Sequence, residues 1–399
     1  MNKKTFMVIG AAILLAGVCY FLLQNRKQPD VILPQETQGV SDTQIILGSV
    51  SALSGVAASL GTNLISGAKV AIGEINDAGG INGRQLKMIS YDDQYDPPKA
   101  VENTQKLINQ DKVFALFNYV GTPTGVKIMP LVEEAKIPLV GMFTGAEIFR
   151  NPLQKYIFNI RGSYYQETEL AIKYFVDNLG LNNVAVFYQA DAFGLAGLEG
   201  AKIALAKRGL SPAALGSFER STTNVEEAVR IVANSDAEAV IMIGTYTPLA
   251  KFVGLVKEKK PNMLFHTVSF VGSESFAKEL DKNFSNIFVT QIVPPLYNNE
   301  LFPSVKKYSE SLAKYDPGVE PTFGGLEGYI NTKVLAEGIR LAGQNLTRES
   351  LVKALESIQN FDVGIGANVS FSGSSHQGLD VVYLTSINNQ GKFVLISVK

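Results

Sequence analysis

The chain has 399 residues, of which 46% are hydrophobic and 18% are charged, and its formal net charge at pH 7 is −1. This length and composition predict a globular protein with room for two domains. The near-zero charge, without any long run of basic residues, excludes an electrostatic surface for nucleic acid, so we expect no nucleic-acid partner.

The N-terminal 24 residues predict a signal anchor or signal peptide. Two lysines are followed by an uncharged stretch, residues 6–23, which is long for a cleaved signal and just long enough to span a bilayer. We favour an uncleaved membrane anchor through residues 6–23. A cleaved signal, or a lipoprotein attached through Cys19, stays open, although Val18 is bulky where a lipobox needs a small residue. Residues 25–43, rich in proline and polar residues, predict a linker.

From residue 44 the chain alternates between strand-like and helix-like segments. Strands are predicted at 44–50, 86–91, 113–117 and 137–142, and helices at 67–76, 97–110 and 124–135. The alternation restarts after residue 161, with helices at 166–178, 194–208, 225–234 and 248–257 and strands at 184–189, 215–218, 239–244 and 264–269. A hairpin, 381–387 with 392–398, follows near the C-terminus. The pattern predicts an α/β fold with two Rossmann-like lobes, each built on a parallel sheet covered by helices.

The stretch FNYVGTPTG, residues 117–125, joins a predicted strand to a predicted helix. Ligands of open α/β sheets bind at the carboxyl ends of the strands, and a helix N-terminus presents unpaired N–H groups to an anion. The hydroxyls of Thr122 and Thr124 add donors at this place. The alternative is that one of these threonines simply caps the helix, and the sequence leaves both interpretations open.

Catalytic and metal-binding patterns are weak. The chain has no GxSxG motif, and its two histidines, His266 and His376, are too few for a histidine-based metal cage. The acidic stretch 92–96 lacks the glycine and the distal glutamate of an EF-hand loop, so it is interpreted as a turn and helix cap. We therefore expect no enzyme activity and no cofactor.

Several glycine and acidic motifs occur in one order and spacing that is specific as a combination. They are ILG at 46–48, LSG at 53–55, Gly61, GA at 67–68, IN at 75–76, GGING at 79–83, YDD at 91–93 and DP at 96–97. With them the chain, from about residue 44 to its C-terminus, resembles the type I periplasmic binding proteins of the leucine/isoleucine/valine-binding family. The resemblance implies a periplasmic receptor that hands a small-molecule solute to an ABC transporter permease. It also implies a hinge of three crossovers between lobe 1 (44–162 plus 293–370) and lobe 2 (163–292 plus 371–399).

The resemblance further assigns candidate ligand-binding residues in both lobes. In the family, the loops that match residues 121–124 and 143–145 grip the carboxylate of the ligand. These loops contribute Gly121, Thr122, Thr124, Phe143, Thr144 and Gly145. The wall from lobe 2 would contain Tyr165, Phe193, Tyr246 and Val271. Aromatic residues more often pack in a protein core than contact a ligand. The three aromatic residues are assigned to the ligand wall because they lie at strand ends and in loops, where burial in the core is less expected.

One position departs from the amino-acid-binding members of the family. Val271 stands where they carry a glutamate that accepts the ammonium group of the ligand. A valine cannot neutralise an ammonium, although Glu274 or Asp191 could substitute. We therefore favour an organic acid without an α-amino group, for example an aromatic one, over a branched-chain amino acid. A ligand-sensing subunit of a membrane signalling system is the alternative to an importer receptor.

Overall fold

The computed structural model describes residues 37–297 and 301–399. The predicted anchor at residues 6–23 and the lipidation alternative at Cys19 lie outside the described residues. Within them, no helix has both the length and the apolar character that a membrane crossing requires.

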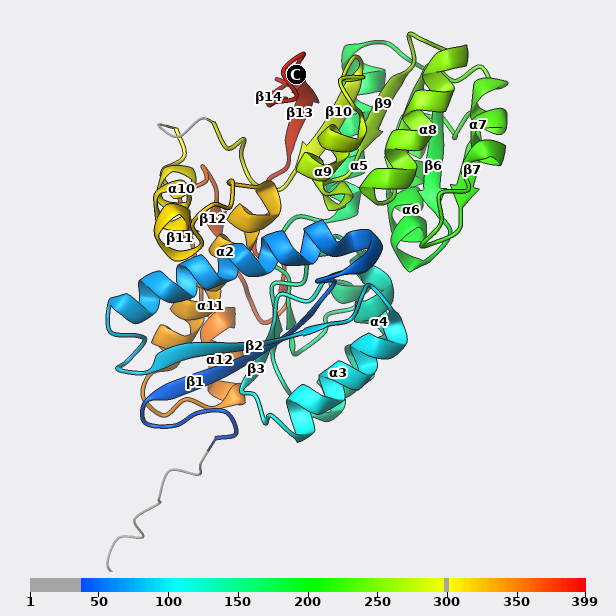
Figure 1. The fold of residues 1–399 in the computed structure, drawn as a ribbon. Helices are drawn as coiled ribbons and strands as arrows, with labels where there is room; N and C mark the ends of the chain where they lie inside the picture. The colour runs from blue at the N-terminus through cyan, green and yellow to red at the C-terminus, as the bar shows by residue number, and fades with distance from the viewer. Residues whose placement is uncertain (1–36, 298–300) are drawn as a thin grey trace, which may run out of the picture. The chain divides into compact units, whose positions relative to one another are not determined.

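Lobe 1 is built on a five-stranded parallel sheet (Figure 1). Its strand order is β2-β1-β3-β4-β5. The strands are β1 (Gln44–Ser51), β2 (Gln85–Asp92), β3 (Ala115–Phe117), β4 (Leu139–Val140) and β5 (Ile157–Phe158). The central strands are almost entirely buried on both faces, as expected for a parallel sheet that helices cover on both sides.

Helices from two distant parts of the chain pack around this sheet. They are α2 (Ala58–Asp77), α3 (Pro97–Asn109), α4 (Thr122–Glu134), α10 (Pro303–Tyr315), α11 (Phe323–Ala342) and α12 (Arg348–Glu356). Short 3₁₀ turns lie at Gly55–Ala57 and Glu147–Phe149, and β11 (Phe361–Asp362) pairs with β12 (Asn368–Val369). Helices α2 and α11 lie against each other, so the segment after residue 303 completes the lobe that the N-terminal half began.

Lobe 2 is built on a seven-stranded sheet with the order β14-β13-β10-β9-β8-β6-β7. Its strands are β6 (Val184–Gln189), β7 (Leu215–Phe218), β8 (Ala239–Ile243), β9 (Leu264–Thr267), β10 (Ile287–Gln291), β13 (Tyr383–Ile387) and β14 (Phe393–Leu395). Its helices are α5 (Tyr164–Ile172), α6 (Ala192–Ala206), α7 (Glu226–Ala233), α8 (Tyr246–Lys259) and α9 (Ser273–Glu279). A π-helical turn, Lys173–Asn178, extends α5, and a 3₁₀ turn, Ser269–Val271, follows β9. The final hairpin joins the sheet antiparallel to β10.

The chain passes between the two sheets three times. It does so between β5 and α5, between β10 and α10, and between β12 and β13. Residues before the third passage still contact lobe 1, because Asn159 pairs with Gln377 and accepts a backbone hydrogen bond from Gly378. The domain boundaries remain a prediction, and these contacts favour a third crossing between residues 378 and 383 over one near residues 369–371.

The predicted fold class is confirmed, and most predicted elements between residues 44 and 270 are present with shifted ends. Helix α2 begins at Ala58 instead of residue 67. Its first turns contain glycine, threonine and asparagine, which have low helix propensity, and packing against α11 stabilises them instead. Helices α10, α11 and α12 were not predicted.

Candidate functional site

The two loops that follow β3 and β4 are joined at Gly121. The Gly121 N–H donates to the carbonyl oxygen of Phe143 over 3.2 Å. Gly121 has φ of 102°, and a Cβ at this position would overlap the ring of Tyr95. A residue without a side chain is therefore required here, both for the backbone conformation and for the approach of Tyr95.

The hydroxyls of Thr122 and Thr144 meet between these loops. Their oxygens are 2.7 Å apart, and both side chains are buried. The hydroxyl of Thr124 instead donates to the carbonyl oxygens of Val120 and Gly121. No hydrogen bond from a side chain of the described residues caps α4. Neither threonine therefore caps this helix, so the capping interpretation is wrong for both.

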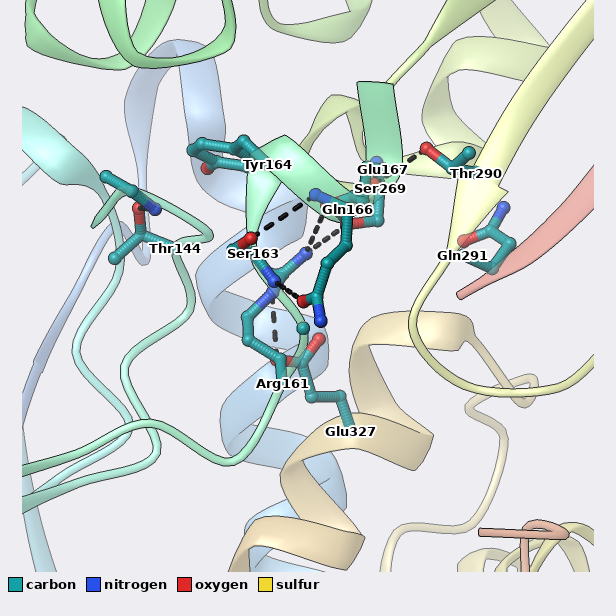
Figure 2. A network of polar contacts seen from close by, with 12 residues as sticks. Thr144, Arg161, Ser163, Tyr164, Gln166, Glu167, Ser269, Thr290, Gln291 and Glu327 are labelled. Atoms are coloured by element: carbon teal, nitrogen blue, oxygen red, sulfur yellow. Dashed lines mark hydrogen bonds and ion pairs between the residues drawn. The ribbon is translucent and has the colours of Figure 1, made fainter. Parts of the chain in front are cut away.

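Tyr164, the first residue of α5, approaches the same loops from lobe 2. Its N–H donates to the carbonyl oxygen of Gly145 over 2.7 Å, and its hydroxyl points toward Thr144 (Figure 2). Burial raises the pKa of Tyr164 to about 12, a rise that the nearby Arg161 and Thr144 limit. This hydroxyl forms no hydrogen bond of good geometry within the described part of the chain. The first crossover thus delivers a neutral hydroxyl donor to the threonine pair.

Arg150 holds the 143–146 loop in place. Its guanidinium donates to the carbonyl oxygens of Ala146 (2.8 Å), Thr144 (3.2 Å) and Arg161 (3.1 Å). Its Nε donates to the side chain of Gln377 over 2.9 Å. One cation therefore ties the loop to both the first and the third crossover segments.

A buried ionic network centred on Arg161 links the lobes at the first crossover (Figure 2). Its guanidinium forms ion pairs with Glu167 of α5 at 3.4 Å and with Glu327 of α11 at 3.6 Å. It also donates to the hydroxyl of Ser269, and it lies 4.7 Å from the ring centre of Phe143. Because Arg161 is 1% exposed, both carboxylates depend on it for charge compensation.

Glu167 extends the network into the lobe 2 sheet. Its carboxylate accepts from the N–H of Ser269 at 2.6 Å, from the Ser269 hydroxyl at 2.9 Å and from the Thr290 hydroxyl at 2.7 Å. The Thr290 oxygen lies 3.1 Å from Nε2 of His266, whose pKa burial lowers to about 3. Because the Thr290 hydroxyl donates its proton to Glu167, its oxygen is left to accept a hydrogen bond from His266. His266 is therefore neutral, with its proton on Nε2.

Phe270 lies at the centre of an aromatic cluster formed by both lobes. Its ring centre is 6.0 Å from that of Tyr95, 5.6 Å from that of Phe143 and 4.6 Å from that of Phe193. The side chain of Phe270 is fully buried. The predicted residues Phe143 and Phe193 thus face the same point from opposite lobes, and the protein's own Phe270 fills that point.

Next to this cluster the lobes enclose a cavity of about 20 Å³, which has room for about one water molecule. The residues that line it come from both lobes and the second crossover: Ser59, Leu60, Asn63, Phe143, Ser269, Gly272, Ser273, Glu274, Gln291, Ile292, Val293, Phe323, Gly324 and Glu327. Two carboxylates but no basic side chain of the described residues line it. A solute of amino-acid size does not fit this volume, so its entry requires the lobes to separate or Phe270 to move.

Of the two acids considered as substitutes at the Val271 position, only Glu274 lines the cavity. Its carboxylate accepts from the N–H of Phe323, the first residue of α11, over 2.8 Å, and burial raises its pKa to about 7. Asp191 is used differently. It caps α6 through the N–H groups of Phe193 and Gly194 and lies 3.8 Å from Arg220.

The remaining candidates lie at different places. Tyr246 contacts Gly272, and Gly272 also packs against Leu60 of α2. Tyr246 therefore lies at the contact between the lobes. Tyr165 packs against α6 at Gly200 and does not line the cavity. Val271 is fully buried in the 3₁₀ turn after β9. Their roles as ligand contacts remain predictions.

The sequence interpretation missed Arg150, Arg161, Glu167, Glu327 and Phe270. A signal was present for two of them, because Arg161 follows an apolar strand directly at the predicted crossover and Glu167 comes six residues later. Nothing local marks Glu327 or Phe270, since their partners are distant in sequence.

The neighbouring acids Asp92 and Asp93 predict opposite pH effects on stability. Desolvation raises the pKa of Asp93 to about 7, so the folded state binds a proton that the unfolded state releases between about pH 4 and pH 7. We expect Asp93→Asn to become more stable than the wild type as pH rises through this window, by a few kcal/mol above pH 7. Urea unfolding from pH 4 to pH 8 measures this difference.

Asp92→Asn is the matched control. Desolvation opposes ionisation of Asp92, but hydrogen bonds from the Ser54 hydroxyl and from the N–H groups of Leu53, Ser54 and Gln94 outweigh it and lower the pKa of the carboxyl. The wild type therefore gains stability from Asp92 above the ordinary aspartate pKa, and Asp92→Asn should lose it there. Parallel pH profiles for the two variants would contradict the assignment of a protonated Asp93.

Comparisons with known proteins agree with the geometry. Residues 44–392 match the family described as periplasmic binding protein. An amino acid binding protein of Pseudomonas aeruginosa is 24% identical over 317 residues, covering 79% of this chain and 82% of the relative. A Leu/Ile/Val-binding protein homolog of Brucella melitensis is 23% identical, covering 81% of this chain and 86% of the relative.

Among solved structures, one described as a possible leucine/isoleucine/valine-binding protein of Rhodopirellula baltica superposes with a TM-score of 0.84 at 29% identity. It covers 90% of this chain and 97% of that protein. The matched region contains the first sheet, the second sheet except its edge strand β14, and the three passages between them. The chain therefore belongs to the periplasmic binding protein family and is a solute-binding protein of the leucine/isoleucine/valine-binding type.

Proposed function

We propose that this protein is the receptor of an ABC importer and binds a small carboxylate-bearing solute between its two lobes. The observation that carries this proposal is the hydroxyl cluster of Thr122, Thr144 and Tyr164, which two loops of lobe 1 and the first helix of lobe 2 bring together. It contains three hydroxyl groups, of which one donates within the threonine pair and two are left to donate. Because it also adjoins the N-terminus of α4, it suits a carboxylate.

The family supports the transport role. Its members named above bind amino acids by their descriptions, and none is described as an enzyme. An importer requires a receptor that presents its solute in a closed form to the permease. Contacts between the lobes, such as the hydrogen bond from Arg220 to the carbonyl oxygen of Tyr95 (2.8 Å), would form only on closure. Uptake of the identified solute by cells with and without the gene tests this role.

Replacing the hydroxyl of Thr122 should weaken carboxylate binding. In Thr122→Val a charge-assisted hydrogen bond is lost, worth roughly 1.5–3 kcal/mol, so we expect the dissociation constant to rise about tenfold or more. Calorimetric titration with a panel of carboxylic acids and the matching amides measures the effect, and the acids should bind more tightly than their amides.

Thr332→Val provides the control for the loss of a buried hydroxyl. Thr332 lies in α11, is fully buried, and donates to the carbonyl oxygen of Gly328, outside the proposed site. Its substitution should leave affinity unchanged. Equal affinity for acids and amides, or an unchanged dissociation constant in Thr122→Val, would refute the carboxylate site.

A further inference from the structure

Phe270 is held by its neighbours on both sides in the chain. On one side, Ser269 is fixed by Glu167 and Arg161. On the other, Gly272 has φ of 78° and packs between Leu60 of lobe 1 and Tyr246 of lobe 2. The turn therefore directs the Phe270 ring across the contact between the lobes.

The ring of Phe270 occupies a box that other aromatic side chains form. Tyr95 and Phe143 come from lobe 1 and Phe193 comes from α6 of lobe 2. A further ring, that of Tyr164, lies 5.3 Å from Phe193 and turns its hydroxyl toward Thr144. The box thus leads directly into the hydroxyl cluster proposed to hold a carboxylate.

Two buried hydroxyls in this box, those of Tyr95 and Tyr164, form no hydrogen bond of good geometry with the described residues. Both side chains are at most 1% exposed. Buried tyrosine hydroxyls in proteins normally find a partner, and unsatisfied ones are costly. Phe270 cannot satisfy them, because its side chain has no polar atom. A ligand with polar atoms at the edge of a planar ring can.

We propose that the ligand is an aromatic carboxylate whose ring replaces that of Phe270 between Tyr95, Phe143 and Phe193. Phe270 is then the residue that sets ligand size, because its ring must leave before the ligand ring enters. Flat rings pack well in such a box through edge-to-face and offset contacts, which an aliphatic side chain cannot reproduce. The inference rests on the proposed carboxylate site and adds the chemical class of the rest of the ligand.

Calorimetric titration of Phe270→Ala with phenylacetate, cyclohexylacetate, acetate and leucine tests the proposal. Phenylacetate should bind this variant at least tenfold more tightly than the wild type, since no ring has to be displaced. Cyclohexylacetate should gain less than phenylacetate. Acetate, which reaches only the hydroxyl cluster, should bind both proteins equally, and leucine should bind both more weakly than phenylacetate does.

Phe252→Ala is the matched control, because Phe252 is also a fully buried phenylalanine of lobe 2 and stacks on Phe187 at 3.9 Å. It should lose stability without any change in affinity. If Phe270→Ala does not fold, Phe270→Leu should show the same ranking with a smaller gain. Unchanged or weaker phenylacetate binding in the Phe270 variants, with acetate still bound, overturns the aromatic proposal alone. Absence of carboxylate binding in all variants overturns the proposed function as well.

Discussion

Arg161→Met should destabilise the folded protein by about 3–5 kcal/mol. The substitution leaves Glu167 and Glu327 buried without the cation that both contact, and an uncompensated buried charge is expensive. Methionine retains most of the volume, so the loss measures charge more than packing. Urea unfolding at pH 8, followed by circular dichroism, gives the free energy of unfolding.

Two further measurements separate charge from packing at Arg161. Burial raises the pKa of Glu327 to about 7 and raises that of Glu167 above its ordinary value. The loss should therefore be largest at pH 8 and shrink as pH falls toward 5, because the two carboxyls then take up protons. Adding Glu327→Gln to Arg161→Met should restore part of the loss. Arg230→Met is the surface control, because its pair with Glu227 is exposed at 63% and 68%, so it should cost less than about 1 kcal/mol. A loss below that value in Arg161→Met would show that the network does not stabilise this crossover.

Gly67→Ala should destabilise lobe 1 by about 3 kcal/mol or more. A Cβ at Gly67 of α2 would overlap the carbonyl oxygen of Gly325 in α11, and backbone atoms cannot move aside as a flexible side chain can. The same variant should weaken solute binding, because displacing α11 also displaces Phe323 and Glu327 at the cavity. Thermal unfolding and calorimetric titration measure the two effects.

Gly254→Ala is the control for this prediction. Gly254 lies in helix α8, and a Cβ there would meet no atom within 4 Å. Alanine has the higher helix propensity, so this variant should gain up to about 1 kcal/mol. Gly328→Ala should resemble Gly67→Ala, since its Cβ would overlap the carbonyl oxygen of Leu64. If Gly67→Ala matched Gly254→Ala, the close approach of α2 and α11 would not limit stability.

Several features of the site follow from local sequence. The proximity of Thr122 and Thr144 could be predicted, because each follows one of two adjacent parallel strands, and the carboxyl ends of such strands meet at one edge of the sheet. The departure at Val271 came from the resemblance to the family, whose amino-acid-binding members carry a glutamate at this position. The same reasoning could not separate the roles of Thr122 and Thr124, since a threonine hydroxyl can bond either to a neighbouring loop or to its own helix.

By itself, the sequence of this protein determined the alternating α/β pattern and the two lobes, because hydrophobic period, glycine positions and the order of the elements along the chain can be read locally. The resemblance to the family added the second of the two loops that meet at Gly121. Only the tertiary structure decided that Arg161 pairs with Glu327, and that the ring of Phe270 packs between those of Phe143 and Phe193. Arg161 and Glu327 are separated by 166 positions in the sequence, and Phe143 and Phe270 by 127 positions. The energy of these contacts comes from burial and charge compensation between the lobes, which no local pattern encodes.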